Sequence, residues 1–371
     1  MDRAKCSSPG ASNSEEVYAI HGAGGSTSRA PALSFWYEYF MAVFAVRLAL
    51  RGRALDAAMA LATAALSWCC HQAWAQSPAN SDALSQGEQL LAAHRDLEAM
   101  AQFESVLANS PYDARARDGE REAAIAVALG EKKAGRGEEA LLCLMRARKA
   151  LPDDVTVLTD LGVQAQMMHQ LPLASGALHE ALVLKPSDPT ALYALARVEL
   201  DQDHFSASEQ LFRAYLTQRP DDSSAHYGLG HLYQKQLRID EARTEFNRSI
   251  ALQPIQTESY YQLGEIALDS GDKEEAQRMF AKTLQRMPTH GGALTGTGIL
   301  AYRAKQYEAA RDSLKSAVIT SPDYQTAHYY LGLTLGRLGD KAGSERELKK
   351  ATDLASAQQG KGQPVVILPA N

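Results

Sequence analysis

The chain has 371 residues, of which 45% are hydrophobic, 22% charged and 7% aromatic, and its formal net charge is -6. This length excludes a peptide hormone or a small protein held together mainly by disulfide bonds. The composition excludes a disordered chain and a polytopic membrane protein, whose spans would each need about 20 apolar residues. The acidic balance leaves no basic excess to neutralise phosphates, so we expect a soluble helical chain that does not bind nucleic acid.

Residues 1–40 form a low-complexity leader rich in Ser, Gly and Ala. The glycine-rich run that begins at Gly22 is not a phosphate-binding loop, because no apolar strand precedes it and no Gly-Lys-Ser/Thr follows it. A secretory signal normally starts near the true N-terminus, and one is predicted from Met41. The leader is therefore interpreted as the product of a misplaced start, with translation from Met1 as the alternative.

Residues 41–75 have the order of features of a secretory signal peptide: three arginines, a mostly apolar stretch from 57 to 70, and the small-x-small sequence Ala73-Trp74-Ala75. The apolar stretch is too short to cross a bilayer comfortably, and no stop-transfer pattern follows. We predict cleavage after Ala75 and export to the periplasm or cell envelope. A cytoplasmic leader and an uncleaved anchor are the alternatives.

Proline recurs with a period of 34 residues, which indicates an internal repeat. The repeat divides residues 80–358 into eight units, and a seven-residue insert, 114–120, is predicted to add about two helical turns after the first unit. Residues 359–371 are predicted to be a flexible tail, and the apolar run from Val365 to Leu368 has no assigned role. The units are 80–113, 121–154, 155–188, 189–222, 223–256, 257–290, 291–324 and 325–358.

Small and large residues recur at fixed places in the units. Glycine or alanine occupies the eighth place, alanine or serine the twentieth, and phenylalanine or leucine the twenty-fourth. The twentieth and twenty-fourth places share one face of a helix, so we predict that small and large residues meet across two helices in each unit. The closing proline ends the second helix because it cannot continue the hydrogen-bond ladder.

This pattern resembles the tetratricopeptide repeat family, whose signature has Leu-Gly, Tyr, Ala, Phe and Pro at these spacings. The resemblance implies an all-α, right-handed superhelical solenoid of about eight antiparallel helix pairs, whose first helices line a concave groove. Departures lie mainly toward the ends, at Gln86, Thr297 and Ser356. Unit 223–256 matches most closely, with Leu229, Gly230, Tyr233, Ala242, Phe246 and Pro254.

No pattern indicates catalysis, a cofactor or a metal site, and the repeats leave no room for a catalytic domain. His226 and His231 diverge by about 140° on a helix, so a shared metal is not expected. His226 and His328 both occupy the fourth, packing place of their units. Cys143 lies in an apolar run and is expected to pack as a small hydrophobe.

The groove face is expected to include the fifth, sixth, ninth and thirteenth places of each unit, if the family geometry holds. Aromatic bodies with polar tips suit peptide binding, although tyrosine is also common at the fifth place in the family. Charges of both signs predict no preference for acidic or basic peptides. The candidate groove residues are Tyr193, Arg197, Tyr227, His231, Tyr261, Gln262, Glu265 and Tyr329, with Thr295 interrupting the tyrosines.

The leading hypothesis is a non-catalytic scaffold of the bacterial cell envelope that holds protein or peptide segments in its groove, with no stable membrane span after cleavage. The alternative is a non-catalytic targeting subunit of an envelope glycosyltransferase or peptidase complex, or a glycan-binding module.

Overall fold

The computed structural model of the chain describes residues 78–359, which form sixteen α-helices and no strand. The predicted leader, the predicted signal peptide and almost all of the predicted tail lie outside these residues. None of the helices between residues 78 and 359 combines the length and the apolar character that crossing a membrane requires. The chain divides into two compact units, which meet in sequence at Gln170 and Leu171.

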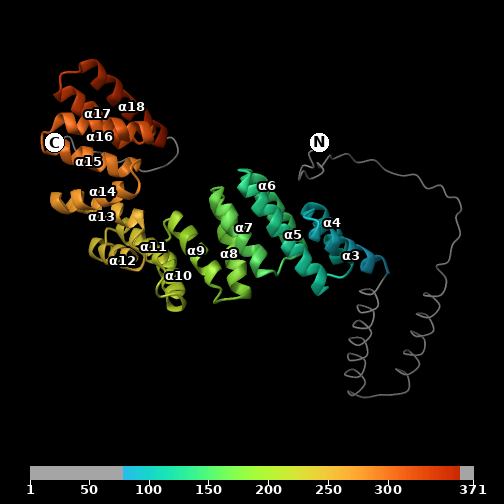
Figure 1. Cartoon of the computed structure of the whole chain (residues 1–371). Helices are drawn as coiled ribbons and strands as arrows, with labels where there is room; N and C mark the ends of the chain where they lie inside the picture. The colour runs from blue at the N-terminus through green and yellow to red at the C-terminus, as the bar shows by residue number, and fades with distance from the viewer. Residues whose placement is uncertain (1–77, 360–371) are drawn as a thin grey trace, which may run out of the picture. The chain divides into compact units, whose positions relative to one another are not determined.

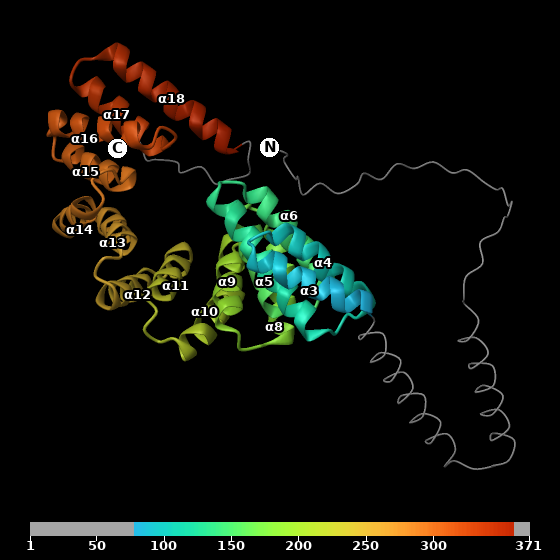
Figure 2. The same cartoon turned by 45° about the vertical axis from the view of Figure 1, so that its right-hand side comes forward.

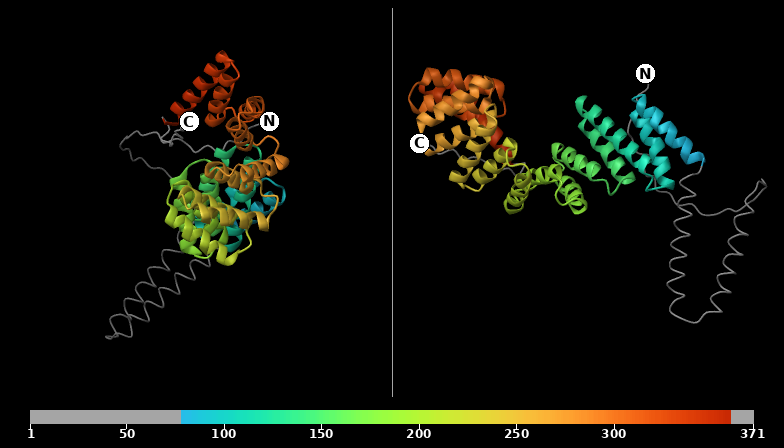
Figure 3. Two further views of the ribbon diagram at one scale, coloured as in Figure 1. Left: turned by 90° about the vertical axis from the view of Figure 1, so that its left-hand side faces the viewer. Right: turned by 60° about the horizontal axis from the view of Figure 1, so that its bottom comes forward.

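The first unit has two antiparallel helix pairs and one further helix around one core. Figure 3 shows the two pairs nearest its beginning, coloured blue to green, side by side. Phe103 is fully buried in this core, and Cys143 is 1% exposed, as predicted for a thiol that packs as a hydrophobe. The helices are α3 (Pro78–Ala92), α4 (Asp96–Asn109), α5 (Ala114–Lys133), α6 (Gly137–Ala150) and α7 (Val155–Met167).

The seven inserted residues lengthen α5, which has 20 residues where α7 has 13. Gly119, within the insert, lies so close to Phe103 that a Cβ there would overlap the ring. The insert therefore carries the contact between α4 and α5. Its last residue, Glu120, is 0% exposed, and neither carboxylate oxygen has a hydrogen-bond partner.

The second unit begins with one helix that is the second of its repeat, and five helix pairs follow it in chain order (Figure 1). The predicted all-α repeat solenoid is confirmed by this arrangement. The helices are α8 (Leu171–Leu184), α9 (Pro189–Asp201), α10 (Phe205–Gln218), α11 (Ser223–Lys235), α12 (Ile239–Leu252), α13 (Thr257–Ser270), α14 (Lys273–Arg286), α15 (Gly291–Arg303), α16 (Tyr307–Thr320), α17 (Gln325–Arg337) and α18 (Lys341–Gln359).

Small residues at the eighth place meet large residues at the twenty-fourth, as the sequence predicts. A Cβ built on Gly264 would lie 2.6 Å from Phe280 Cε1, and one built on Gly230 would lie 2.8 Å from Phe246 Cδ1. Both phenylalanine side chains are 0% exposed. Any side chain at these glycines would therefore push the two helices of the pair apart.

The turn between the two helices of a pair uses left-handed backbone at the fifteenth place of all eight repeats. Gly135, Gly271 and Gly339 have φ values of 75°, 78° and 88°. The other five residues at this place are not glycine and have φ values from 55° to 61°. They are His94, His169, Asp203, Leu237 and Lys305.

The residue before each first helix, at the thirty-fourth place, caps that helix in some repeats and not in others. Asp113, Asp154, Asp188 and Asp222 each accept a hydrogen bond from a backbone N–H of the first turn. His290 does the same through Nδ1, which accepts from the Ala293 N–H at 3.0 Å. The side chains of Gln256 and Tyr324 make no capping hydrogen bond. A cap is worth about 1 kcal/mol, so α13 and α17 begin with less support.

The second helices end two residues before the repeating proline, as in α16, which stops at Thr320 before Pro322. The last repeat has Ser356 in place of proline. Its second helix, α18, continues to Gln359 and has 19 residues against 14 in α16 (Figure 2). Loss of the proline thus lengthens the final helix.

Candidate functional site

The three fifth-place tyrosines of α9, α11 and α13 are half-buried, and each ring packs on the twenty-fourth-place phenylalanine of its own repeat. The ring centroids are 6.0 Å apart for Tyr193 and Phe212, 5.8 Å for Tyr227 and Phe246, and 6.2 Å for Tyr261 and Phe280. The fully buried phenylalanines hold the tyrosines in place, so their exposed parts are presented with little freedom to lose on binding.

At α9 the predicted residues Tyr193 and Arg197 contact each other. The Arg197 guanidinium carbon lies 6.0 Å from the centroid of the Tyr193 ring, and the centroid of the Tyr215 ring lies 5.3 Å from the same point. Burial raises the pKa of Tyr193. Because Arg197 is exposed, the α9 end of the three tyrosines offers a positive charge beside an aromatic ring.

At α11 the rings of Tyr227 and His231 stack with centroids 6.4 Å apart and planes 11° apart. Burial raises the pKa of Tyr227, and the side chain of Gln262, on α13, opposes that rise. Burial lowers the pKa of His231, and the positive charge of Lys235 lowers it further. A neutral imidazole therefore lies beside a tyrosine whose hydroxyl is close to a polar side chain of the next repeat.

At α13 burial raises the pKa of Tyr261, and the nearby carboxyl of Glu265 and hydroxyl of Tyr324, which precedes α17, raise it further. Burial raises the pKa of Glu265 to about 7, and the negative charge of Asp269 contributes to the increase. Near neutral pH this carboxyl is present in both its protonated and its charged form. It can therefore donate or accept a hydrogen bond toward a ligand.

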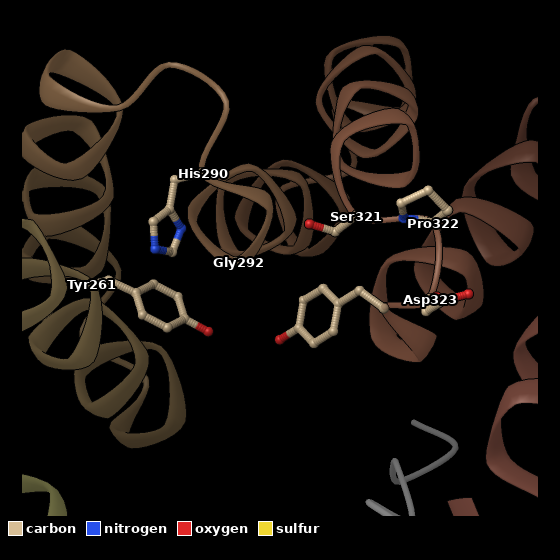
Figure 4. Close-up of a pocket in the computed structure, with 7 residues that line it drawn as sticks. Tyr261, His290, Gly292, Ser321, Pro322 and Asp323 are labelled. Atoms are coloured by element: carbon tan, nitrogen blue, oxygen red, sulfur yellow. The ribbon is translucent and has the colours of Figure 1, made fainter. Parts of the chain in front are cut away.

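We call the surface made by Tyr193, Tyr227 and Tyr261 with Arg197, His231, Gln262 and Glu265 the tyrosine face. A cavity of about 460 Å³ opens at its α13 end. Figure 4 shows Tyr261 and His290 on one side of this cavity and Ser321, Pro322 and Asp323 on the other. We call it the tyrosine pocket; it is lined by Tyr261, His290, Gly292, Ser321, Pro322, Asp323 and Tyr324.

Two predicted features lie outside this surface. Thr295, which interrupts the tyrosines, is 1% exposed and offers no contact to a ligand. Tyr329 is half-buried and packs edge-on against Tyr330, with centroids 5.4 Å apart. The eight predicted residues thus form three local groups on successive first helices, together with Tyr329 apart on α17.

Of the seven residues that line the tyrosine pocket, only Tyr261 was predicted as a site residue, and His290, Gly292 and Tyr324 are among the six that were not. The Tyr261 and His290 ring centroids lie 4.6 Å apart, and Gly292 lies against the Tyr261 ring. The sequence does distinguish two of these residues. The thirty-fourth place is aspartate at Asp154, Asp188 and Asp222, whereas two later repeats have His290 and Tyr324 there. At Tyr324, which makes no capping hydrogen bond, lining the pocket has replaced helix capping.

The fourth-place histidines have packing roles. His226 Nδ1 lies 2.6 Å from a Glu245 carboxylate oxygen, and its Nε2 lies 3.0 Å from the carbonyl oxygen of Pro220. His328 repeats this arrangement with Glu347 at 2.6 Å and Pro322 at 2.9 Å. Each histidine therefore connects its own repeat to the end of the preceding one. Over the described part of the chain, no three His, Cys, Asp or Glu side chains are grouped to hold a metal ion.

Comparison with known protein families identifies one type of repeat. A family model described as tetratricopeptide repeat matches residues 168–223, 227–286, 261–324 and 295–358, which together are just over half of the chain. No curated protein matches the sequence significantly.

Solved structures give similar folds at low sequence identity. The Cut9–Hcn1 hetero-tetramer of APC/C has a TM-score of 0.54 at 15% identity, covering 74% of this chain and 52% of that chain. A tetratricopeptide repeat protein from Parabacteroides merdae ATCC 43184 has a TM-score of 0.51 at 15% identity, covering 70% and 100%. The pilF protein of Pseudomonas aeruginosa has a TM-score of 0.50 at 19% identity, covering 57% and 96%. At these identities the likeness concerns the fold alone.

Proposed function

The chain belongs to the tetratricopeptide repeat family, and from this premise we propose that it is a non-catalytic scaffold that binds an extended protein segment along the tyrosine face. Proteins of this family generally mediate interactions between proteins. The finer proposal, that binding occurs on the first helices α9, α11 and α13, rests on the arrangement of the three tyrosines.

The observation that carries the proposal is the packing of each of these tyrosines on a buried phenylalanine. Polar side chains lie near the hydroxyls of Tyr227 and Tyr261. Rigid aromatic side chains give a large contact area at a low entropy cost. This suits them to anchor a partner segment.

The polar groups of the tyrosine face favour a partner of mixed character. Arg197 offers a positive charge, His231 an imidazole held neutral by burial, and Glu265 a carboxyl with a pKa of about 7. Such groups hydrogen-bond a peptide backbone or uncharged polar side chains. We therefore propose an extended segment with apolar anchors and no strong net charge.

The proposed location is the cell envelope, supported by the order of basic, apolar and small-x-small sequence in residues 41–75. Sequencing the N-terminus of the mature protein tests this proposal. A mature chain that begins at Gln76 is the expected result. A chain that begins at Met1 and stays in the cytoplasm would contradict it.

Affinity capture from an envelope extract tests the binding proposal. The full chain is compared with a Tyr193→Ala, Tyr227→Ala double variant and with Tyr112→Ala, a matched change at a tyrosine that is 77% exposed between α4 and α5. A partner retained by the full chain and by Tyr112→Ala, but lost by the double variant, is the expected result. Equal retention by all three would place the interaction elsewhere. Recovery of a single transferase or peptidase would favour a targeting subunit over a general scaffold.

A further inference from the structure

The tyrosine pocket lies at the end of the last repeat from which the chain leaves its final helix. Helices α17 and α18 run antiparallel: a Cβ on Gly332 would lie 2.7 Å from Leu348 Cγ, and one on Gly336 would lie 3.2 Å from Ser344 Oγ. Each step back along α17 is a step forward along α18, so Tyr324 falls opposite residue 356. Figure 2 shows α18 beside α17 and longer than it.

The helix α18 ends at Gln359, only three residues beyond that point, which is about 4.5 Å along a helix. Residues 360–371 therefore start from the end of the repeat where Tyr324 lines the pocket. Six extended residues span up to about 20 Å, enough to bring Val365 around the N-terminal end of α17, since a helix is about 10 Å across.

The pocket is suited to a short apolar segment. The rings of Tyr261 and Tyr324 and the side chain of Pro322 line it, and its volume of about 460 Å³ has room for a few side chains. Gly292, which has no side chain, lets the Tyr261 ring lie directly against α15. Tyr324 stands where four repeats have a capping aspartate, so the chain gives up a helix cap for an aromatic wall.

Residues 360–371 have the matching chemistry. Four apolar residues, Val365 to Leu368, are bounded by Pro364 and Pro369. Each proline fixes its own φ and disfavours helix at the residue before it, so this run loses little freedom when it docks in extended form. The only charged residue of the twelve is Lys361, and the exposed carboxylate of Asp323 lies at the pocket.

We propose that residues 360–371 dock into the tyrosine pocket of the same molecule, with the run from Val365 to Leu368 against Tyr261 and Tyr324 and with Lys361 near Asp323. This goes beyond partner binding on the tyrosine face, because it needs no second protein. Since Tyr261 belongs to both surfaces, the docked tail competes with a partner that reaches the α13 end of the tyrosine face.

Disulfide trapping in the full chain tests the proposal directly. In a background where the four native cysteines are replaced, Asp323→Cys is combined with Val366→Cys. The matched control combines Val366→Cys with Gln306→Cys, an exposed position at the other end of α16, about 20 Å away along the helix. Intrachain disulfide should form at least tenfold faster with the cysteine at 323. Equal rates, or disulfides that join two chains, would overturn the proposal.

Hydrogen exchange gives a readout without added cysteines. A chain that ends at Gln359 should exchange the amides of residues 321–326 at least fivefold faster than the full chain, and a synthetic peptide of residues 360–371 should restore protection. Ile367→Asp in the full chain should act like the truncation. Unchanged exchange in both variants would refute docking. Neither experiment includes a partner, so failure here is distinguishable from failure of the binding proposal.

Discussion

Gly292 and Tyr261 touch without room for another atom: a Cβ built on Gly292 would stand 2.6 Å from Tyr261 Cζ and 2.7 Å from its hydroxyl oxygen. The glycine lies in the first turn of α15, and the tyrosine lies on α13, the first helix of the preceding repeat. This contact fixes the position of the Tyr261 ring relative to the following repeat. The shape of the tyrosine pocket therefore depends on a residue that has no side chain.

Gly292→Ala should displace the Tyr261 ring. Overpacking costs about 1 to 3 kcal/mol, and the better helix propensity of alanine offsets up to about 1 kcal/mol of that loss. The ring resonances of labelled Tyr261 should shift, and urea unfolding should show reduced stability. Gly176→Ala is the matched control, because no atom lies within 4 Å of a Cβ there, and it should stabilise α8 by about 0.5 to 1 kcal/mol. Unchanged Tyr261 resonances would contradict the prediction.

Gly264→Leu should loosen one helix pair and leave distant ones intact. The new side chain would overlap Phe280, at a cost of about 1 to 3 kcal/mol, and in stacked repeats each unit contacts only its neighbours. Hydrogen exchange should increase in α11 to α16 and remain unchanged in α3 to α7. A uniform loss of protection would mean that the array unfolds as one cooperative domain.

Leu237→Gly should stabilise the protein. Leu237 is 82% exposed and has φ 60°, so its side chain has little to lose and its backbone is strained. Left-handed backbone costs a non-glycine residue roughly 1 kcal/mol or more. We expect a higher midpoint in thermal unfolding. The reverse change, Gly271→Ala at φ 78°, should lower it. If both variants moved the midpoint in the same direction, backbone strain would not be the cause.

Stability should fall as the pH rises from about 4.5 to about 8 because of Glu120. Burial raises the pKa of this carboxyl to about 8 in the folded chain, with the nearby Glu104 contributing, against an ordinary value of 4.5. The folded form thus binds the proton more tightly, and the stabilisation present below pH 4.5 is lost toward pH 8.

Between these two pH values the free energy of unfolding should fall by up to about 1.4 kcal/mol per pH unit. Glu120→Gln should abolish this part of the pH dependence in urea unfolding. Glu122→Gln, two residues along α5 and exposed, should retain it. Parallel curves for wild type and Glu120→Gln would show that Glu120 does not titrate in this range.

Tyr227→Ala should weaken the binding of a partner by about 1 to 2 kcal/mol, because partly buried aromatic anchors dominate interface energies. It should leave the helicity of the protein nearly unchanged. Tyr261→Ala should have a similar effect on a partner that reaches α13. Calorimetric titration with a captured partner measures both. Lys282→Ala, on the second helix α14, should have little effect on binding, although its ammonium lies 5.2 Å from the Tyr260 ring centroid and contributes there to packing. Equal losses at Lys282 and Tyr227 would place the partner on the second helices.

The sequence predicts the helix pairs and their packing well because these depend on places that recur. Gly264 and Phe280 occupy the eighth and twenty-fourth places of one repeat, and their contact is the same in its neighbours. The tyrosine pocket is different. Tyr261 and Tyr324 occupy different places, the fifth and the thirty-fourth, in successive repeats, so comparing like places cannot reveal that both line one pocket. Glu120 was missed for a related reason, since it lies in the insert, outside the repeating pattern.

The pattern of capping residues has a consequence for engineering and for how this surface evolves. Gln256 and Tyr324 both leave a first helix uncapped, but only Tyr324 lines the tyrosine pocket. Gln256→Asp would restore about 1 kcal/mol of capping without changing the pocket. Tyr324→Asp would likewise add a cap to α17, but it would remove the aromatic ring that lines the pocket. Stability and recognition can thus be adjusted separately at the thirty-fourth place of one repeat and only in opposition at the same place of another.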